Sequence, residues 1–358
     1  MPDTTPRSRR APLLTAVAAS FALVLFVAFA GAVPPQEGTD EAWTIELAAP
    51  APHPSLAYER LDDLETLSCW GCHETIAEEW ALTQHGHAWV DGHYQEALKT
   101  KRRPQSCYGC HIPTPLHQAP ADRFGRKPRP REEEAEKRHF GISCRSCHAG
   151  PDDAILGPWG AETDAHKSQQ GESFTELGSN RLCLACHKTT VGPVIGVGKD
   201  FDLELLEERG MSCVACHMHP VERPAATDDN DQPTAVRKGR SHLLQTPRDP
   251  AFLASSFALS ARADGGRTLL TIKNRAGHRV PGLVDRKLAF RVEALDAAGA
   301  AVAEAEHTID DVAYLPIFGA VDVALDAQAA KVRVTALHHA PGTDAPIPFL
   351  DGVELPVE

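Results

Sequence analysis

Five short segments of the chain repeat one pattern: a cysteine, two further residues, a second cysteine and then a histidine. The cysteine pairs are Cys69 and Cys72, Cys107 and Cys110, Cys144 and Cys147, Cys183 and Cys186, and Cys213 and Cys216. The histidines that follow them are His73, His111, His148, His187 and His217. Two thiols one helical turn apart can bond to the two vinyl groups of a porphyrin, and the next residue then lies under the iron. The pattern therefore predicts five covalently attached c-type haems with these histidines as proximal ligands.

Two other uses of paired cysteines fit the pattern less well. Zinc ribbons use such pairs two at a time and do not require a histidine after each second cysteine. Redox dithiols usually occur once per domain. The chain has 10 cysteines and the five motifs contain all of them, so none remains for a disulfide, a zinc site or a catalytic nucleophile.

Composition is consistent with a chain that folds around porphyrins. The 358 residues carry a formal net charge of -13 and are only 6% aromatic. Few aromatic side chains are available to build large cores, and five flat apolar porphyrins would supply the missing bulk. The acidic charge favours a basic protein partner and argues against binding to nucleic acid.

The N-terminus has the features of a targeting segment. Arg7, Arg9 and Arg10 precede a nearly continuous apolar run at 13–32, which Pro34 ends. We expect residues 1–33 to be a signal peptide or an N-terminal membrane anchor, and small residues at 28–32 favour cleavage. The protein is then exported, either to the periplasm or to the outer face of the cytoplasmic membrane, and contacts the membrane only if this segment is uncleaved.

The rest of the chain divides into three parts that differ in composition and in the pattern of apolar residues. Residues 34–60 are rich in proline and alanine and are predicted to be a linker. Residues 61–249 contain the motifs and predict a mainly α, haem-packed cytochrome c domain with little regular sheet. Apolar positions 76, 77 and 80 have helical spacing after the first motif. From 250 to 358 alternating apolar residues predict an antiparallel β-sandwich, with strands at 257–262, 267–273, 288–295 and 331–337, a Gly-Gly hairpin turn after Asp264 and a turn at Gly299.

The segment from Cys69 through Trp80 to His85 resembles the opening haem segment of the cytochrome c-552/4 multihaem family. Met211 to Met218 resembles the closing haem motif of such proteins, and Arg240-Ser241-His242 resembles a histidine segment that follows it. Asn274 to Pro281 is similar to a Gly-His-x-x-Pro loop of a fused sandwich, although Gly282-Leu283 replaces the usual Thr-Gly. The resemblance implies an electron carrier with closely packed, mostly bis-His haems.

Histidines outside the motifs are the candidates for the second axial ligand of each iron. Of the 18 histidines, five lie in the motifs and 13 remain, which exceeds what five irons require. The leading distal candidates are His85, His242, His278, His139 and His166, and His87, His93 and His117 are substitutes. If His278 binds iron, the sandwich supplies a ligand to the haem domain. The methionines adjoin the fifth motif or the N-terminus, so methionine ligation is disfavoured.

Two classes of function fit these residues. An electron carrier passes electrons along closely packed, mostly bis-His haems between redox proteins as donor and acceptor, and a membrane redox complex is one setting for it. The alternative is a multihaem reductase or oxidase of a small nitrogen or sulfur compound, which needs one open haem iron with acid and base residues nearby. No motif singles out an open iron, and the surplus of histidines favours the electron carrier.

Overall fold

The structure is a computed structural model that describes residues 68–118, 128–131, 135–160, 163–175, 177–190, 196–283, 285–341, 343 and 345–358. The predicted leader and linker at 1–33 and 34–60 therefore lie outside the described residues. Everything described belongs to one compact unit of the chain. No helix among the described residues has the length and hydropathy of a membrane span.

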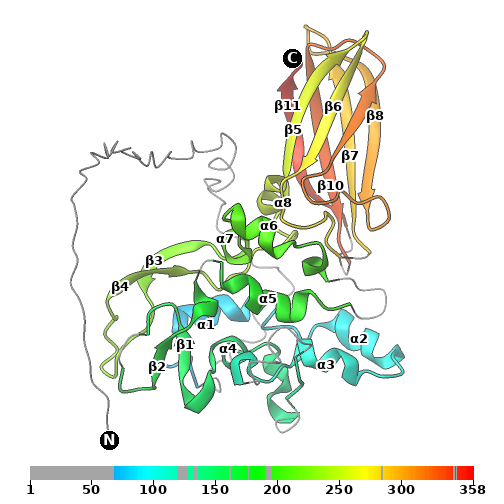
Figure 1. The fold of residues 1–358 in the computed structure, drawn as a ribbon. Helices are drawn as coiled ribbons and strands as arrows, with labels where there is room; N and C mark the ends of the chain where they lie inside the picture. The colour runs from blue at the N-terminus through cyan, green and yellow to red at the C-terminus, as the bar shows by residue number, and fades with distance from the viewer. Residues whose placement is uncertain are drawn as a thin grey trace, which may run out of the picture. The chain divides into compact units, whose positions relative to one another are not determined.

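The region of the motifs is built from short helices, as predicted (Figure 1). The α-helices are α1 (Glu74–Ala81), α2 (Gly92–Thr100), α3 (Gln105–His111), α4 (Cys144–His148), α5 (Ser179–His187), α6 (Leu203–Glu208) and α7 (Cys213–His217). Single 3-10 turns lie at Leu116–Gln118, Ala135–Phe140, Pro151–Asp153, Glu172–Phe174 and Val197–Lys199. Two small two-stranded sheets complete the region: parallel β1 (Ile155–Gly157) with β2 (Ser168–Gln170), and antiparallel β3 (Pro220–Pro224) with β4 (Val236–Arg240).

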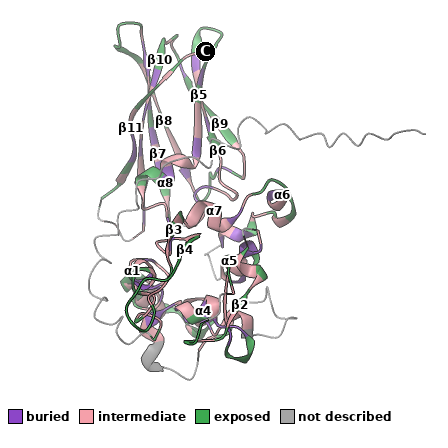
Figure 2. Cartoon of the chain, turned by 90° about the vertical axis from the view of Figure 1, so that its left-hand side faces the viewer, coloured by how far each residue is buried: buried purple, intermediate pink, exposed green. Residues whose placement is uncertain are grey.

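The helices of this region bury little apolar side chain of their own. The apolar cluster of buried residues described here is small and consists of Ala77, Trp80, Ala81 and Phe140. Most residues around the motifs are only partly buried, as the pink colouring of Figure 2 shows. Because helices this short are not stable without packing, the region depends on apolar bulk other than its own side chains.

The C-terminal region is an antiparallel β-sandwich, as predicted. After α8 (Pro250–Ser255), one sheet has the order β5-β6-β9 and the other β11-β10-β7-β8. The strands are β5 (Phe257–Asp264), β6 (Arg267–Asn274), β7 (Lys287–Leu295), β8 (Ala301–Asp310), β9 (Ala320–Leu325), β10 (Lys331–His339) and β11 (Ile347–Pro356). The expected hairpin forms between β5 and β6, where Asp264 pairs with Arg267 and both intervening glycines have positive φ.

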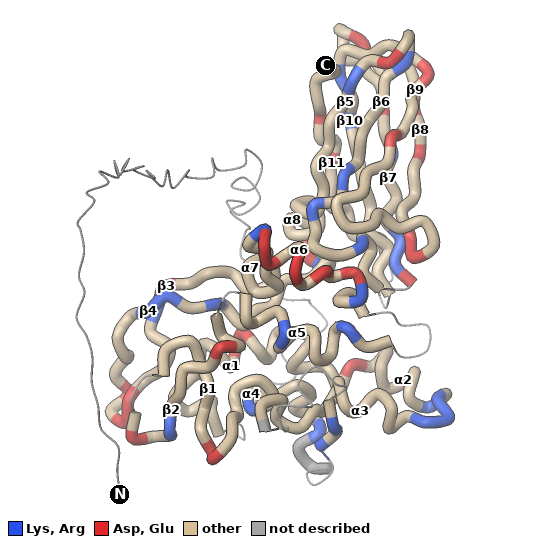
Figure 3. The backbone as a smooth tube through the Cα atoms, in the orientation of Figure 1, with Lys and Arg blue, Asp and Glu red and all other residues tan. Residues whose placement is uncertain are grey.

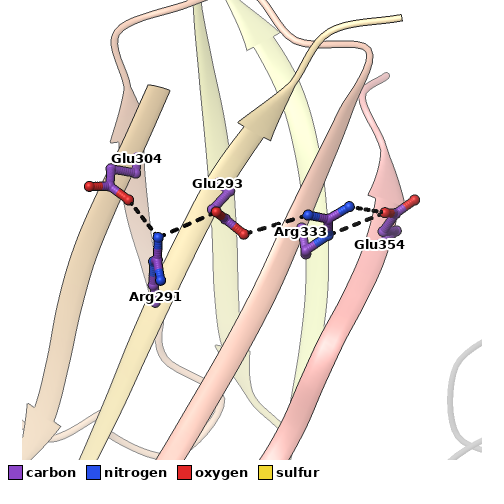
Figure 4. Close-up of polar contacts among 5 residues, drawn as sticks. All are labelled: Arg291, Glu293, Glu304, Arg333 and Glu354. Atoms are coloured by element: carbon purple, nitrogen blue, oxygen red, sulfur yellow. Dashed lines mark hydrogen bonds and ion pairs between the residues drawn. The ribbon is translucent and has the colours of Figure 1, made fainter. Parts of the chain in front are cut away.

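Alternation of apolar and polar residues places the sandwich core between the two sheets. The core contains Phe290, which is 1% exposed and packs its ring edge-on against Phe257 and Phe349. On the solvent face of the larger sheet, charged side chains of alternating sign cross four strands in the order Glu304, Arg291, Glu293, Arg333 and Glu354 (Figure 4). Such exposed pairs add little stability each, and together they link all four strands of the larger sheet.

Replacement of Phe290 by alanine tests whether the sandwich core has the described packing. We expect Phe290→Ala to lower the free energy of unfolding by about 3–5 kcal/mol because it leaves a cavity among closely packed rings. Chemical denaturation monitored by circular dichroism in the β-sheet region measures this loss. Phe290→Leu, which keeps more of the volume, should lose less, and equal losses in the two variants would contradict the packing.

Candidate functional site

The five motifs adopt similar local structures. The second and fourth motifs end α3 and α5, and the third and fifth motifs coincide with α4 and α7. The first motif forms a helical turn before α1, in which the amide of His73 donates to the carbonyl of Cys69. In each case one helical turn places both thiols and the following imidazole on the same side, as covalent attachment of a porphyrin requires.

Four of the motif imidazoles lie opposite a second imidazole from a distant part of the chain. The ring centres are separated by 6.4 Å for His73 and His166, 6.1 Å for His187 and His85, 6.0 Å for His148 and His242, and 6.4 Å for His217 and His278. The planes of each pair are inclined by 19° to 38°. No hydrogen bond is recorded within any pair.

This separation is the one that a shared iron requires. A ligating nitrogen lies about 2 Å from its metal and about 1 Å from its own ring centre, so two imidazoles on opposite sides of one iron have ring centres roughly 6 Å apart. Direct stacking of two imidazoles would bring the rings much closer. The four pairs therefore fit axial ligation of four haem irons, with one ligand from the motif and one from elsewhere.

Hydrogen bonds at Nδ1 leave Nε2 available for a metal. The Nδ1 atoms of His73, His148 and His217 lie 2.7, 2.7 and 2.8 Å from the carbonyl oxygens of Ala225, Leu156 and Gln245. In His111 the same atom lies 2.5 Å from the carbonyl of Ala88. An Nδ1–H donated to a carbonyl fixes the tautomer and orients the ring, which is the usual support of a metal-binding histidine.

Burial favours the neutral form of six of the paired imidazoles, as metal ligation requires. Loss of hydration lowers the pKa of His85 to about 3 and the pKa of His217 and His242 to about 4. The pKa values of His148, His187 and His278 are also lowered, mainly by burial. Isolated buried imidazoles in such numbers would be costly without a partner.

The one motif histidine outside these four pairs, His111 of the second motif, has a different neighbour. The ring of Tyr94, from α2, lies parallel to the ring of His111, with centres 3.7 Å apart and planes inclined by 4°. No second imidazole of the described residues faces His111. The Tyr94 hydroxyl is buried without a hydrogen-bond partner, and burial raises its pKa. Sequence reasoning did not single out Tyr94, and no motif would have indicated it.

The motif cysteines lie close to one another in space. All ten are partly buried. Cys69 lies near Cys144, Cys183 near Cys213 and Cys186 near Cys110. Porphyrins attached at these motifs would therefore meet along the edges that carry the cysteine bonds. The neighbours would be the porphyrins of the first and third motifs, of the fourth and fifth, and of the second and fourth.

The segments that carry the opposing imidazoles are fixed by ionic contacts. Glu79 of α1 pairs with Arg223 through two hydrogen bonds of 2.7 and 2.6 Å and also accepts the amide of His242 at 2.7 Å. The Arg223 contact holds the pKa of Glu79 below its usual range despite burial. Only the three-dimensional contacts of Glu79 connect it to His242.

The loop that carries His278 joins the sandwich to the helical region. Arg279 pairs with Asp200 and lies over the ring of Tyr314, 4.2 Å from its centre. On the other side, the Asn274 side-chain amide donates to the carbonyls of His278 and Pro316, both at 2.9 Å. The sandwich thus holds the His278 imidazole in place opposite His217.

The other predicted histidines have different surroundings. The ring beside His139 is Phe140, with centres 4.1 Å apart. His93 is exposed on α2, and His87 is buried with Nδ1 2.9 Å from the carbonyl of Thr83. Near the third motif, Phe174 stacks on His148 and also adjoins His117.

Residues 68–149 and 159–218 match the family described as cytochrome c554 and c-prime. The matched residues are less than half of the chain; over them the match supports a multihaem c-type cytochrome with covalently bound haem, and a β domain follows them in the same chain.

A similar solved structure is the crystal structure of a penta-heme cytochrome c552 from Thermochromatium tepidum. It is 16% identical to this chain, covers 81% of this chain and 98% of its own, and has a TM-score of 0.54, so the likeness concerns the fold. A red sea bream transglutaminase is also similar over 37% of this chain and 22% of its own, with 15% identity and a TM-score of only 0.18. No curated protein matches the chain.

Replacement of His85 tests the pairing of imidazoles. We expect His85→Ala to convert one haem, the one attached at the fourth motif, from low spin to high spin, because its iron loses one strong-field ligand. Electron paramagnetic resonance of the oxidised protein measures the change, and added imidazole should restore the low-spin signal. His93→Ala is the matched control and should leave the spectrum unchanged. An unchanged spectrum in His85→Ala would contradict the pairing of His85 with His187.

Proposed function

We propose that the chain binds five covalent c-type haems and carries electrons between redox proteins outside the cytoplasmic membrane. The observation that supports this most strongly is the set of four imidazole pairs with ring centres 6.0 to 6.4 Å apart. An iron with an imidazole on each side has no free position for a substrate and can only gain or lose an electron. The proposed axial ligands are the five motif histidines with His85, His166, His242 and His278.

The bound haems would supply the one-electron chemistry, and the residues of the chain fix their spacing and surroundings. Carbonyl acceptors at Nδ1 hold the proximal rings in one orientation. The ion pairs of Glu79 and Arg279 hold the segments of His242 and His278. Rigid ligands reduce the structural change that accompanies oxidation and reduction, which favours rapid electron transfer.

The cysteine contacts support a branched order of haems in space. The fourth motif adjoins the second motif through Cys186 and Cys110 and the fifth motif through Cys183 and Cys213. Cys147 of the third motif lies near Cys183 of the fourth, and the third motif in turn adjoins the first through Cys144 and Cys69. We place the fourth haem at the centre of the array, with routes to the second, third and fifth.

The charge distribution suits protein partners of more than one kind. The net charge of -13 favours a basic redox partner over most of the surface. Between α2 and α3, however, Lys101, Arg102 and Arg103 are consecutive and exposed, and Figure 3 shows this group beside the second motif. An acidic partner would suit this end, so donor and acceptor need not share one surface. A membrane redox complex is one setting for such partners.

A second function is supported by the surroundings of His111. Its ring neighbour is Tyr94 rather than an imidazole, so the second haem is where an iron with an open position would lie. A multihaem reductase or oxidase of a small nitrogen or sulfur compound would use this position. Tyr94 stacks on the proximal ring, however, and is not an acid or base positioned for a substrate on the opposite face.

Electron redistribution within one molecule tests the proposed carrier. After a flash-generated flavin semiquinone delivers one electron, we expect a second spectral phase whose rate is independent of protein concentration, because neighbouring haems exchange the electron internally. Transient absorption spectroscopy measures both phases. His85→Ala, which alters the central haem, should slow the second phase, whereas His93→Ala should not. Absence of any concentration-independent phase would contradict the electron-carrier proposal.

Carbon monoxide binding and assays of substrate consumption distinguish the electron carrier from the reductase. We expect the reduced protein to bind at most one carbon monoxide per chain, at the second haem, because the other four irons are closed by paired imidazoles. With reduced viologen as electron donor, we expect no sustained consumption of nitrite or sulfite. Sustained turnover would favour the reductase, and binding of several carbon monoxide molecules per chain would contradict the closed irons.

A further inference from the structure

Two arginines without a carboxylate partner lie where the fifth motif meets the sandwich. Arg286 is only partly exposed, and its Nη1 lies 3.5 Å from Nε2 of His338. Burial and, to a smaller extent, the neighbouring Arg248 lower the pKa of Arg286, and Arg248 donates to the carbonyl of Pro341 at 3.2 Å. Among the described residues no carboxylate forms an ion pair with either guanidinium. A partly buried cation without a counter-charge is costly, so a negatively charged group is expected nearby.

The fifth motif and this arginine pair are joined by one backbone segment. The backbone carbonyl of Gln245 accepts from Nδ1 of His217, and the backbone N–H of Gln245 donates to the carbonyl of His217 at 2.9 Å. Two residues later, the carbonyl of Pro247 accepts from Nδ1 of His338 at 2.9 Å. His338 is 1% exposed and, held in this way, presents Nε2 to Arg286. A chain of contacts therefore runs from the His217 imidazole through residues 245–247 and His338 to Arg286.

A buried amide in the same segment also lacks a partner. The Gln245 side chain is 1% exposed, and neither its Oε1 nor its Nε2 forms a hydrogen bond. Each such unsatisfied group costs about 1–3 kcal/mol. An amide this deeply buried without a partner points to a polar ligand at the site, independently of the arginines.

We propose that Arg286, Arg248 and the Gln245 amide form a binding site for a carboxylate beside the fifth motif. Guanidinium groups bind carboxylates through paired charge-assisted hydrogen bonds, and the amide N–H supplies a further donor. Given the proposed five haems, the carboxylate is expected to be a propionate of the fifth haem. A free carboxylate or phosphate ion has the same chemistry and is the other source.

The site has a consequence for electron transfer that does not depend on which source fills it. Positive charge near a haem favours the reduced state and raises its midpoint potential. Removing one guanidinium should therefore lower the potential of the fifth haem alone. The neutral imidazole of His338, whose pKa burial lowers to about 4, adds no charge of its own at neutral pH.

Substitution of the arginines in the full-length, haem-loaded protein tests the site. We expect Arg286→Gln and Arg248→Gln each to lower one of five midpoint potentials in a spectroelectrochemical titration and to shift the propionate bands in the resonance Raman spectrum. Arg267→Gln is the matched control, because Arg267 is exposed in the β5–β6 hairpin and makes the same change of charge. It should change neither readout.

The source of the carboxylate is decided by added anions. If a propionate fills the site, acetate and phosphate should leave the wild-type Raman bands and potentials unchanged. If a free ion fills it, one potential should respond saturably to acetate or phosphate in the wild-type protein and not in Arg286→Gln, with unchanged propionate bands.

Two further variants keep the test decisive if the glutamine variants fold poorly. Arg286→Lys keeps the charge but not the paired hydrogen bonds, and Gln245→Met removes the amide at similar volume; both should shift the propionate bands with little change in melting temperature. No change of potential, Raman bands or anion response in any of these variants would overturn the proposal. A haem count below five in the wild-type protein would instead contradict the proposed function.

Discussion

The distance between paired imidazoles is the constraint on which the helical region depends. Four motif histidines each face a second histidine at 6.0 to 6.4 Å between ring centres. The opposing residues come from the turn that follows α1, from the segment that precedes β2, from the segment after β4 and from a loop of the sandwich. Each iron held in this way would cross-link two parts of the chain. A region with few buried apolar side chains of its own thus gains the links that its short helices cannot provide.

The sandwich contributes to the redox region as well as to stability. Its own core is dense and includes the three packed phenylalanines. At the end that adjoins the motifs, His278 faces His217, Arg279 pairs with Asp200, and Arg286 lies beside His338. The sandwich therefore supplies both the imidazole that faces His217 of the fifth motif and the arginine of the proposed carboxylate site. This explains physically why a cysteine-free β domain follows a haem domain in one chain.

The sequence allowed accurate prediction of features that rest on local patterns. The motifs, the amphipathic helix containing Trp80, the hairpin after Asp264 and the apolar strands β5, β6, β7 and β10 all have local periodicity or fixed spacing. Strands β8, β9 and β11 were not predicted. In β8 alanine alternates with glutamate, which is a weak apolar pattern, and β11 contains prolines and an Asp-Gly pair that usually mark turns.

Contacts between distant residues could not be predicted in the same way. His85, His166, His242 and His278 were nominated as distal ligands, but spacing cannot say which proximal histidine each one faces, and their ligation remains a prediction. Tyr94 beside His111, the Glu79 contact with the His242 amide and the arginine pair at the fifth motif depend on the path of the chain in space. No local pattern marks such residues.

Electron paramagnetic resonance of the oxidised wild-type protein, integrated against its chemically determined haem content, is the most direct measurement. The central claim is that paired imidazoles close at least four of five irons. This account predicts five haems per chain, at least four of them low spin with the signature of two imidazole ligands. Two or more high-spin haems in the fully loaded protein would contradict it.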